Sequence, residues 1–138
     1  MSQRITLLAL TFTASGLVSR HRAIGFDGAQ ATVQGQRVAG VAHFDAADGD
    51  DLTVGCAGTE IIETGAAIAI TDTLIIDAEG RAIPSSGELS VDAGGTAVTS
   101  TAADGAILSG GDMPEYVFAD PLETADGAGE FIEVLLRR

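Results

Sequence analysis

The sequence predicts an all-β fold, either a small β-barrel or a β-sandwich. Segments with the apolar period of a helix are nearly absent from the 138 residues. Short runs rich in Thr, Val and Ile recur instead, and these residues favour extended backbone. Acid–glycine pairs separate the runs and are typical of tight turns, because Gly tolerates a positive φ; they are Asp27-Gly28, Asp48-Gly49, Glu79-Gly80, Asp104-Gly105 and Asp126-Gly127.

These turns divide the chain into eight predicted strands. The first has Thr at three positions and only a short apolar centre, which favours a strand over the signal peptide that it superficially imitates. In the fourth, Leu52, Val54 and Cys56 alternate with small or polar residues, as one buried face requires. The predicted strands cover residues 5–13, 17–26, 38–44, 52–56, 59–63, 73–77, 115–118 and 131–136.

A small β-unit is predicted to be duplicated within one domain that spans residues 1–138. The first copy covers about residues 5–64 and the second about residues 65–137. An irregular insertion rich in Gly, Ala, Ser and Thr, at about residues 85–111, lengthens the second copy. We expect this insertion to be an exposed excursion or an extra hairpin.

The charge of the chain excludes several classes of partner. Twenty Asp and Glu stand against seven Arg and no Lys, which gives a net charge of −13. Such a charge opposes binding to a phosphate backbone or an anionic lipid surface, so neither nucleic acid nor a membrane is an expected partner. The longest apolar stretches are also far shorter than the roughly 20 residues of a membrane-spanning helix. Residues 70–138 carry most of the excess acid, which predicts one strongly negative end or face.

The sequence contains no recognisable catalytic or cofactor motif. Neither His21 nor His43 stands beside a nucleophile or a second metal ligand, so both are interpreted as ordinary surface or satisfied histidines. The acidic run of residues 45–51 lacks the spacing of a calcium loop, and we expect its carboxylates to cap backbone donors in a turn. Cys56 is the single cysteine, which excludes an intrachain disulfide and fits a buried strand residue in a reducing compartment. No enzyme activity, metal or cofactor is expected.

The order of short motifs supplies the best indication of function. Gly16-Leu17-Val18 and Phe26-Asp27-Gly28 precede Val38-Ala39-Gly40-Val41-Ala42, and the chain closes on Phe131-Ile132-Glu133-Val134-Leu135-Leu136. Over nearly its whole length the chain resembles the capsid cement, or head decoration, proteins of tailed bacteriophages. The second unit departs from that pattern, because residues 113–120 replace the expected counterpart of Val38–Ala42.

The resemblance implies a structural protein that binds the outer surface of a phage or phage-like capsid and stabilises the mature shell. It implies the major capsid protein as partner, a homo-oligomer that is often a trimer, and synthesis in the bacterial host cytoplasm before assembly on the virion. It supplies no catalytic residues. Many symmetric contacts would act together at such a site, so each single contact can be weak.

Two groups of residues are candidates for contact with the capsid or another partner. The N-terminal segment, residues 2–10, could add as a terminal strand to a partner's sheet, which makes Arg4, Ile5 and Leu7 candidates, although the same segment also fits a plain core strand. Arg20 and Arg22 would share one face of the predicted strand 17–26 and could bind a partner's carboxylate.

The alternative function is a head-fibre or surface carbohydrate-recognition module, in which the insertion at residues 85–111 would carry the binding site. Few side chains are available for stacking on sugars, because the chain has no Trp, one Tyr and five Phe.

Overall fold

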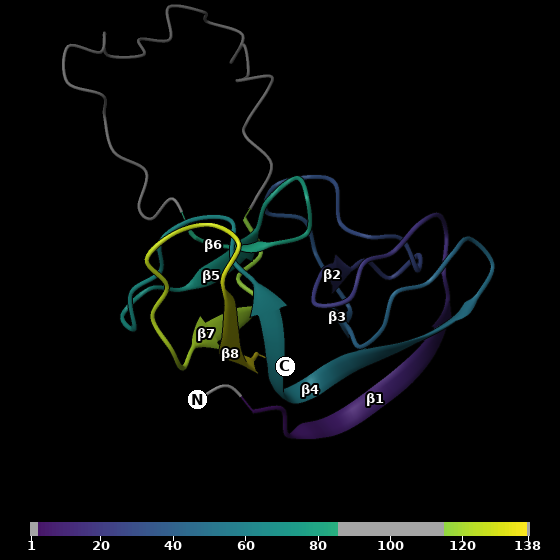
Figure 1. Cartoon of the computed structure of the whole chain (residues 1–138), viewed down its shortest axis with the longest axis horizontal. Helices are drawn as coiled ribbons and strands as arrows, with labels where there is room; N and C mark the ends of the chain where they lie inside the picture. Colours follow the sequence, from purple (N-terminus) through teal and green to yellow (C-terminus); the bar gives the residue numbers. More distant parts are fainter. Residues whose placement is uncertain (1–2, 86–114, 138) are drawn as a thin grey trace, which may run out of the picture.

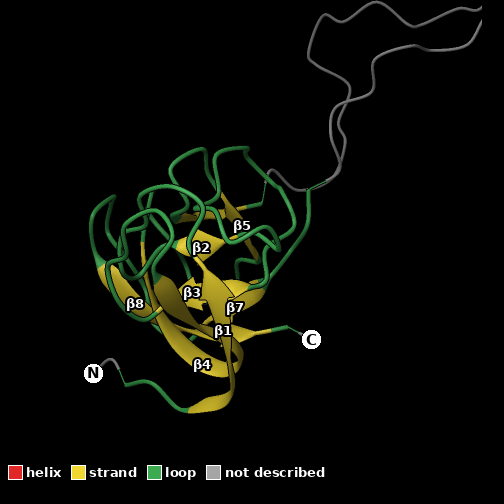
Figure 2. Ribbon diagram, turned by 90° about the vertical axis from the view of Figure 1, so that its right-hand side faces the viewer, coloured by secondary structure: helices red, strands yellow, loops and turns green. Residues whose placement is uncertain are grey.

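The computed structural model describes residues 3–85 and 115–137, and the described chain is all-β with no helix, as predicted (Figures 1 and 2). The strands are β1 (Thr6–Thr13), β2 (Ala23–Ile24), β3 (Gly40–Ala42), β4 (Asp51–Glu63), β5 (Leu74–Ile76), β6 (Ala82–Pro84), β7 (Ala119–Pro121) and β8 (Phe131–Leu136).

The strands form one curled antiparallel sheet in which β4 is the central element. The pairing order is β2-β3-β4-β8-β7-β5-β6, and β1 is paired with β4 outside this path. The first part of β4, Asp51 to Gly58, pairs with β1, whereas Thr59 to Glu63 pair with β8. Figure 1 shows β1 and this part of β4 as a long curved ribbon along the lower edge of the molecule. The strand β4 therefore joins the two ends of the sheet.

Two apolar clusters form the core of the described chain. The larger includes Ile62, Leu74 and Ile132 and draws on β4, β5, β7 and β8. The smaller includes Val18, Leu52 and Val54, with the partly buried Phe12 of β1 packed against it. The smaller cluster consists mainly of short side chains, so it buries less of the apolar surface of β1, which packs against it.

A pattern of backbone hydrogen bonds occurs twice along the chain. Ala14 donates to the carbonyl of Asp50 and accepts from Gly49. Thr64 likewise donates to Glu130 and accepts from Gly129. Reciprocal bonds also join two residue pairs at matching places, Val18 with Ala46 and Ile68 with Ala125. In this pattern the second half of β4 takes the place that β1 has in the first part of the chain.

Several predicted strands differ from the observed ones. Residues 17–26 are a strand only at Ala23–Ile24, because His21 adopts a φ of 61° and the segment's amides bond to several different segments. The predicted strands 52–56 and 59–63 are one strand, since Gly58 with a φ of 101° allows the chain to continue through an irregularity. Residues 115–118 form no strand, because Tyr116 and Phe118 donate to Gly35 and Leu74; β7 begins at Ala119. The strand β6 is not predicted at all.

The turn predictions are confirmed at three of the acid–glycine pairs. Gly28, Gly49 and Gly80 all have φ between 78° and 85°. At the pair Asp126-Gly127 the prediction is wrong by two residues, since Gly129 has the positive φ of 86°. The pair at 104–105 and nearly all of the predicted insertion lie outside the described residues.

Candidate interaction surface

The N-terminal segment presents large apolar side chains to solvent. The exposed fractions are 54% for Ile5, 79% for Leu7, 47% for Leu8 and 45% for Leu10. The strand β1 is paired with β4 along one edge, and its other edge has no strand partner within residues 3–85 and 115–137. An edge strand of this kind is open to pairing with another chain. Most of the apolar area of β1 therefore lies outside the protein's own core.

A buried carboxylate fixes the start of β1. The side chain of Glu60 is only 1% exposed, and it accepts a hydrogen bond of 2.5 Å from the hydroxyl of Thr6. The Nε2 atom of His43 lies 3.0 and 3.1 Å from the two carboxylate oxygens, and Nε of Arg4 lies 3.9 Å from one of them. Because a buried carboxylate is costly without partners, these contacts tie the N-terminal segment to β3 and β4.

Two glycines allow this close approach. A Cβ atom at Gly55 would overlap the carboxylate of Glu60, so the absence of a side chain makes room for the acid. A Cβ at Gly58 would overlap the carbonyl of Ile5, whose oxygen accepts a bond from Thr59. The path of β1 along β4 therefore depends on the small residues of β4.

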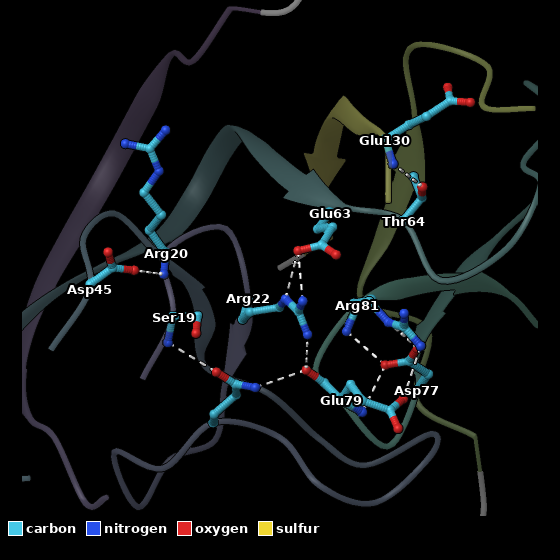
Figure 3. A network of polar contacts seen from close by, with 11 residues as sticks. Ser19, Arg20, Arg22, Asp45, Glu63, Thr64, Asp77, Glu79, Arg81 and Glu130 are labelled. Carbon is cyan, nitrogen blue, oxygen red and sulfur yellow. Dashed lines mark hydrogen bonds and ion pairs between the residues drawn. The ribbon is translucent and has the colours of Figure 1, made fainter. Parts of the chain in front are cut away.

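The structure separates the two candidate arginines of the turn (Figure 3). The guanidinium of Arg22 lies 2.7 Å from the carboxylate of Glu63 and donates to the carbonyl of Glu79 at 2.8 Å. The backbone of Arg20 donates to Asp45, but its guanidinium forms no hydrogen bond or ion pair with any described residue. Arg20 and Arg22 thus do not share the face of a strand, and Arg22 already holds a carboxylate of its own chain.

Between them, His21 packs on the start of β8. Its Nδ1 atom lies 3.1 Å from the carbonyl of Ile61, and its ring meets the edge of Phe131 with centroids 5.3 Å apart. Burial lowers the pKa of His21, and the hydrogen bond with Ile61 opposes this effect. Both histidines are thus satisfied by neighbours, as the sequence suggested.

A mainly polar groove that includes exposed apolar side chains lies beside β8. This open groove of about 460 Å³ is lined by three exposed apolar side chains, Ile70, Leu122 and Phe131, which are 54%, 46% and 52% exposed. Glu123 and Glu130 stand in the same wall. The groove therefore combines apolar surface with negative charge.

The remaining candidates have structural roles. Carboxylates of the acidic run cap backbone amides, with Asp48 accepting from Gly16 and Asp50 from Ala47. Cys56 is buried in β4. The described residues contain no cluster of side chains suited to a metal ion. Within the same residues, no helix is long and apolar enough to cross a membrane.

Sequence reasoning identified the apolar start of the chain but missed its anchor and the groove. Glu60 and His43 are far apart in the sequence and meet only through the pairing of β3 with β4. The groove brings Ile70 next to Leu122 and Phe131, which belong to distant segments. The only sequence signal for the groove was that two large apolar residues, Ile70 and Leu122, lie in segments predicted to be loops.

Comparison with known proteins identifies the family. Residues 2–110 match the phage cement protein family. No curated protein matches the sequence significantly. The structure resembles the crystal structure of the N base of head fiber gp8.5 in bacteriophage phi29, with a TM-score of 0.61 and 17% identity over 94% of this chain and 95% of that chain. At that identity the likeness shows the shared fold alone. The chain belongs to the phage cement protein family, and it is a structural protein that decorates and stabilises a phage capsid.

Proposed function

We propose that the protein binds the outer surface of the mature capsid at junctions between major capsid subunits, as a homo-oligomer that is expected to be a trimer. Several copies acting together at a symmetric junction give strong binding from weak single contacts. The family supports the capsid as partner. The role is structural rather than enzymatic, and the described polar clusters fix turns and strands.

The exposed apolar strand β1 is the observation that carries this proposal. Leu7 is 79% exposed in a chain whose net charge is −13. A solvated monomer gains nothing from such surface, whereas burial against a partner releases about 25 cal/mol for each Å² of apolar area. The proposed contact with the capsid or a sister copy includes Arg4, Ile5, Leu7 and Arg20, with Arg22 holding the turn that presents Arg20.

The charge of the chain fits the outer surface. A net charge of −13 keeps many copies soluble in the host cytoplasm, where we expect synthesis, and repels packaged DNA. The single buried cysteine is compatible with a reducing compartment.

Binding to capsids tests the proposal directly. Purified protein is mixed with undecorated expanded capsids and, in parallel, with unexpanded shells, and the particles are then sedimented. We expect saturable binding at a fixed ratio of copies to capsid subunits on the expanded shells alone, with greater resistance of the decorated particle to heat. No binding to a competent cognate capsid would contradict the proposal and would favour glycan recognition by the segment at residues 85–111.

A further inference from the structure

We propose that the start of β1 in one copy, comprising Arg4, Ile5 and Leu7, docks in the groove of a second copy, comprising Ile70, Leu122, Phe131, Glu123 and Glu130. This inference rests on the proposed assembly of several copies and names the surfaces that join them. The segment around Arg4 is called the arm below, and the second surface the groove.

The apolar parts of the two surfaces match in kind. Ile5 and Leu7 of the arm are more than half exposed, and so are Ile70 and Phe131 of the groove. Each surface presents its apolar side chains beside charged ones. This composition is typical of a specific interface rather than of non-specific hydrophobic association. Docking removes both exposed patches at once.

The charges of the two surfaces are complementary. Residues 3–26 contain Arg4, Arg20 and Arg22 and no Asp or Glu. Residues 120–133 contain five acids and no base. Two copies that each carry a charge of −13 repel one another overall, so their contact needs such a local match of opposite charges. The arm itself carries one charge, that of Arg4, whose Nε also lies 3.9 Å from Glu60 of its own copy, and the groove carries Glu123 and Glu130.

The arm does not occupy the groove of its own copy: Gln3 donates to Glu133 of β8, but Ile5 and Leu7 stay more than half exposed and line no part of the groove. Leu8 pairs with Ala57 and Leu10 with Val54, so β1 runs along the first part of β4. Phe131 pairs with Glu63 at the far end of the same strand. The Glu60 anchor holds Thr6 in place at 2.5 Å, which fixes the arm against β4. The groove is therefore open to the arm of another copy.

Because arm and groove are different surfaces, the contact is head-to-tail. A contact of this type closes into a ring when its rotation divides a full turn and otherwise grows into a filament. The expected trimer corresponds to the closed ring. A symmetric pairing of two arms would instead stop at a dimer.

Two single variants and their mixture test the contact. Leu7→Asp disables the arm, and Ile70→Asp disables the groove, at side chains that are both largely exposed. The matched control is Leu17→Asp, because Leu17 is 80% exposed and belongs to neither surface. The mass of each protein is measured by sedimentation, with far-ultraviolet circular dichroism to check the fold.

We expect the wild type and Leu17→Asp to form the same oligomer, and each of the other variants to be monomeric. An equimolar mixture of Leu7→Asp and Ile70→Asp retains one intact arm and one intact groove, so it should form dimers that cannot close. Persistence of the oligomer in either variant, or a mixture that stays monomeric, would overturn the proposal.

A crosslink provides a second readout that does not depend on disruption. On a Cys56→Ser background, the pair Leu7→Cys and Ile70→Cys should give covalent multimers on mild oxidation, whereas either cysteine alone should give at most dimers. Absence of multimers would contradict the contact.

Capsid binding by the same variants separates this inference from the proposed function. If the wild type and Ile70→Asp bind capsids equally well and Leu7→Asp does not, the arm contacts the capsid. The inference then fails although the proposed function stands.

Discussion

The strand β1 and the second half of β4 occupy matching places in the recurring hydrogen-bond pattern, yet their side chains meet different surroundings. Ile62 of β4 is completely buried in the larger cluster, whereas Phe12, which holds the matching position in β1, is only partly buried against the smaller one, and Leu10 beside it is 45% exposed. The matching stretch of backbone thus packs into the core in one place and presents apolar surface in the other. This contrast supports the proposal that β1 is kept apolar for assembly rather than for folding.

The largest expected effect tests the buried member of this comparison. Ile62→Ala should lower the free energy of unfolding by about 3 kcal/mol, because it opens a cavity in the larger cluster. The measurement is urea unfolding followed by circular dichroism. The comparison variant is Leu10→Ala in β1, which should lower the free energy of unfolding by well under half as much as Ile62→Ala. Equal decreases in the two variants would show that β1 is a core strand.

The second largest expected loss of stability is at Glu60, which anchors the start of β1. Glu60→Gln keeps the shape of the side chain but removes the charge that faces His43, Thr6 and Arg4, and we expect a loss of about 2 kcal/mol. The control is Glu79→Gln, since the Glu79 side chain is 58% exposed and its ion pair with Arg81 contributes little. Protection of β1 amides from hydrogen exchange should fall in Glu60→Gln only. Unchanged protection would refute the anchoring role.

A smaller effect should appear at the exposed position of β1. Leu7→Ser removes apolar surface that the isolated chain leaves in solvent, so the free energy of unfolding should change by no more than about 0.5 kcal/mol. The thermal midpoint of monomeric protein at low concentration measures this. A large drop would mean that Leu7 packs within its own copy.

The smallest effect is a dependence on pH at the contact between the two parts of the sheet. Burial lowers the pKa of His21 in the folded protein, so the unfolded chain takes up the proton first as the pH falls. The stability that neutral His21 contributes to the folded protein is fully present above the pKa of the unfolded chain, near 6.5. It is lost as the pH falls below that value. His21→Asn tolerates the positive φ and should lose less stability than the wild type between pH 7.5 and 5.5. An identical loss would exclude His21 as the cause.

Parts of the fold that depend on local pattern were predictable from the sequence. The strands β1 and β8 are long enough to show their apolar and β-branched composition, and Gly28, Gly49 and Gly80 mark turns because the backbone there needs a positive φ. The matching bonds at Ala14 and Thr64 support the predicted duplication, which stays a prediction.

Features that depend on tertiary contacts were not predictable. The segment at residues 17–26 has the composition of a strand, but its amides bond to several partners around the turn at His21. The anchor of Glu60 depends on a glycine at position 55 and on the register of β3 with β4. Exposure of the apolar residues of β1 follows from the small size of the cluster beneath them, which no local pattern encodes.

The most direct test of the central claim is the number of copies that wild-type protein and Leu7→Asp leave on expanded capsids at saturation, measured side by side after sedimentation. The wild type should saturate at a fixed symmetric ratio, and Leu7→Asp should bind far fewer copies at the same concentration while remaining folded. Equal binding of the two proteins would contradict the claim that the exposed face of β1 exists for assembly on the capsid.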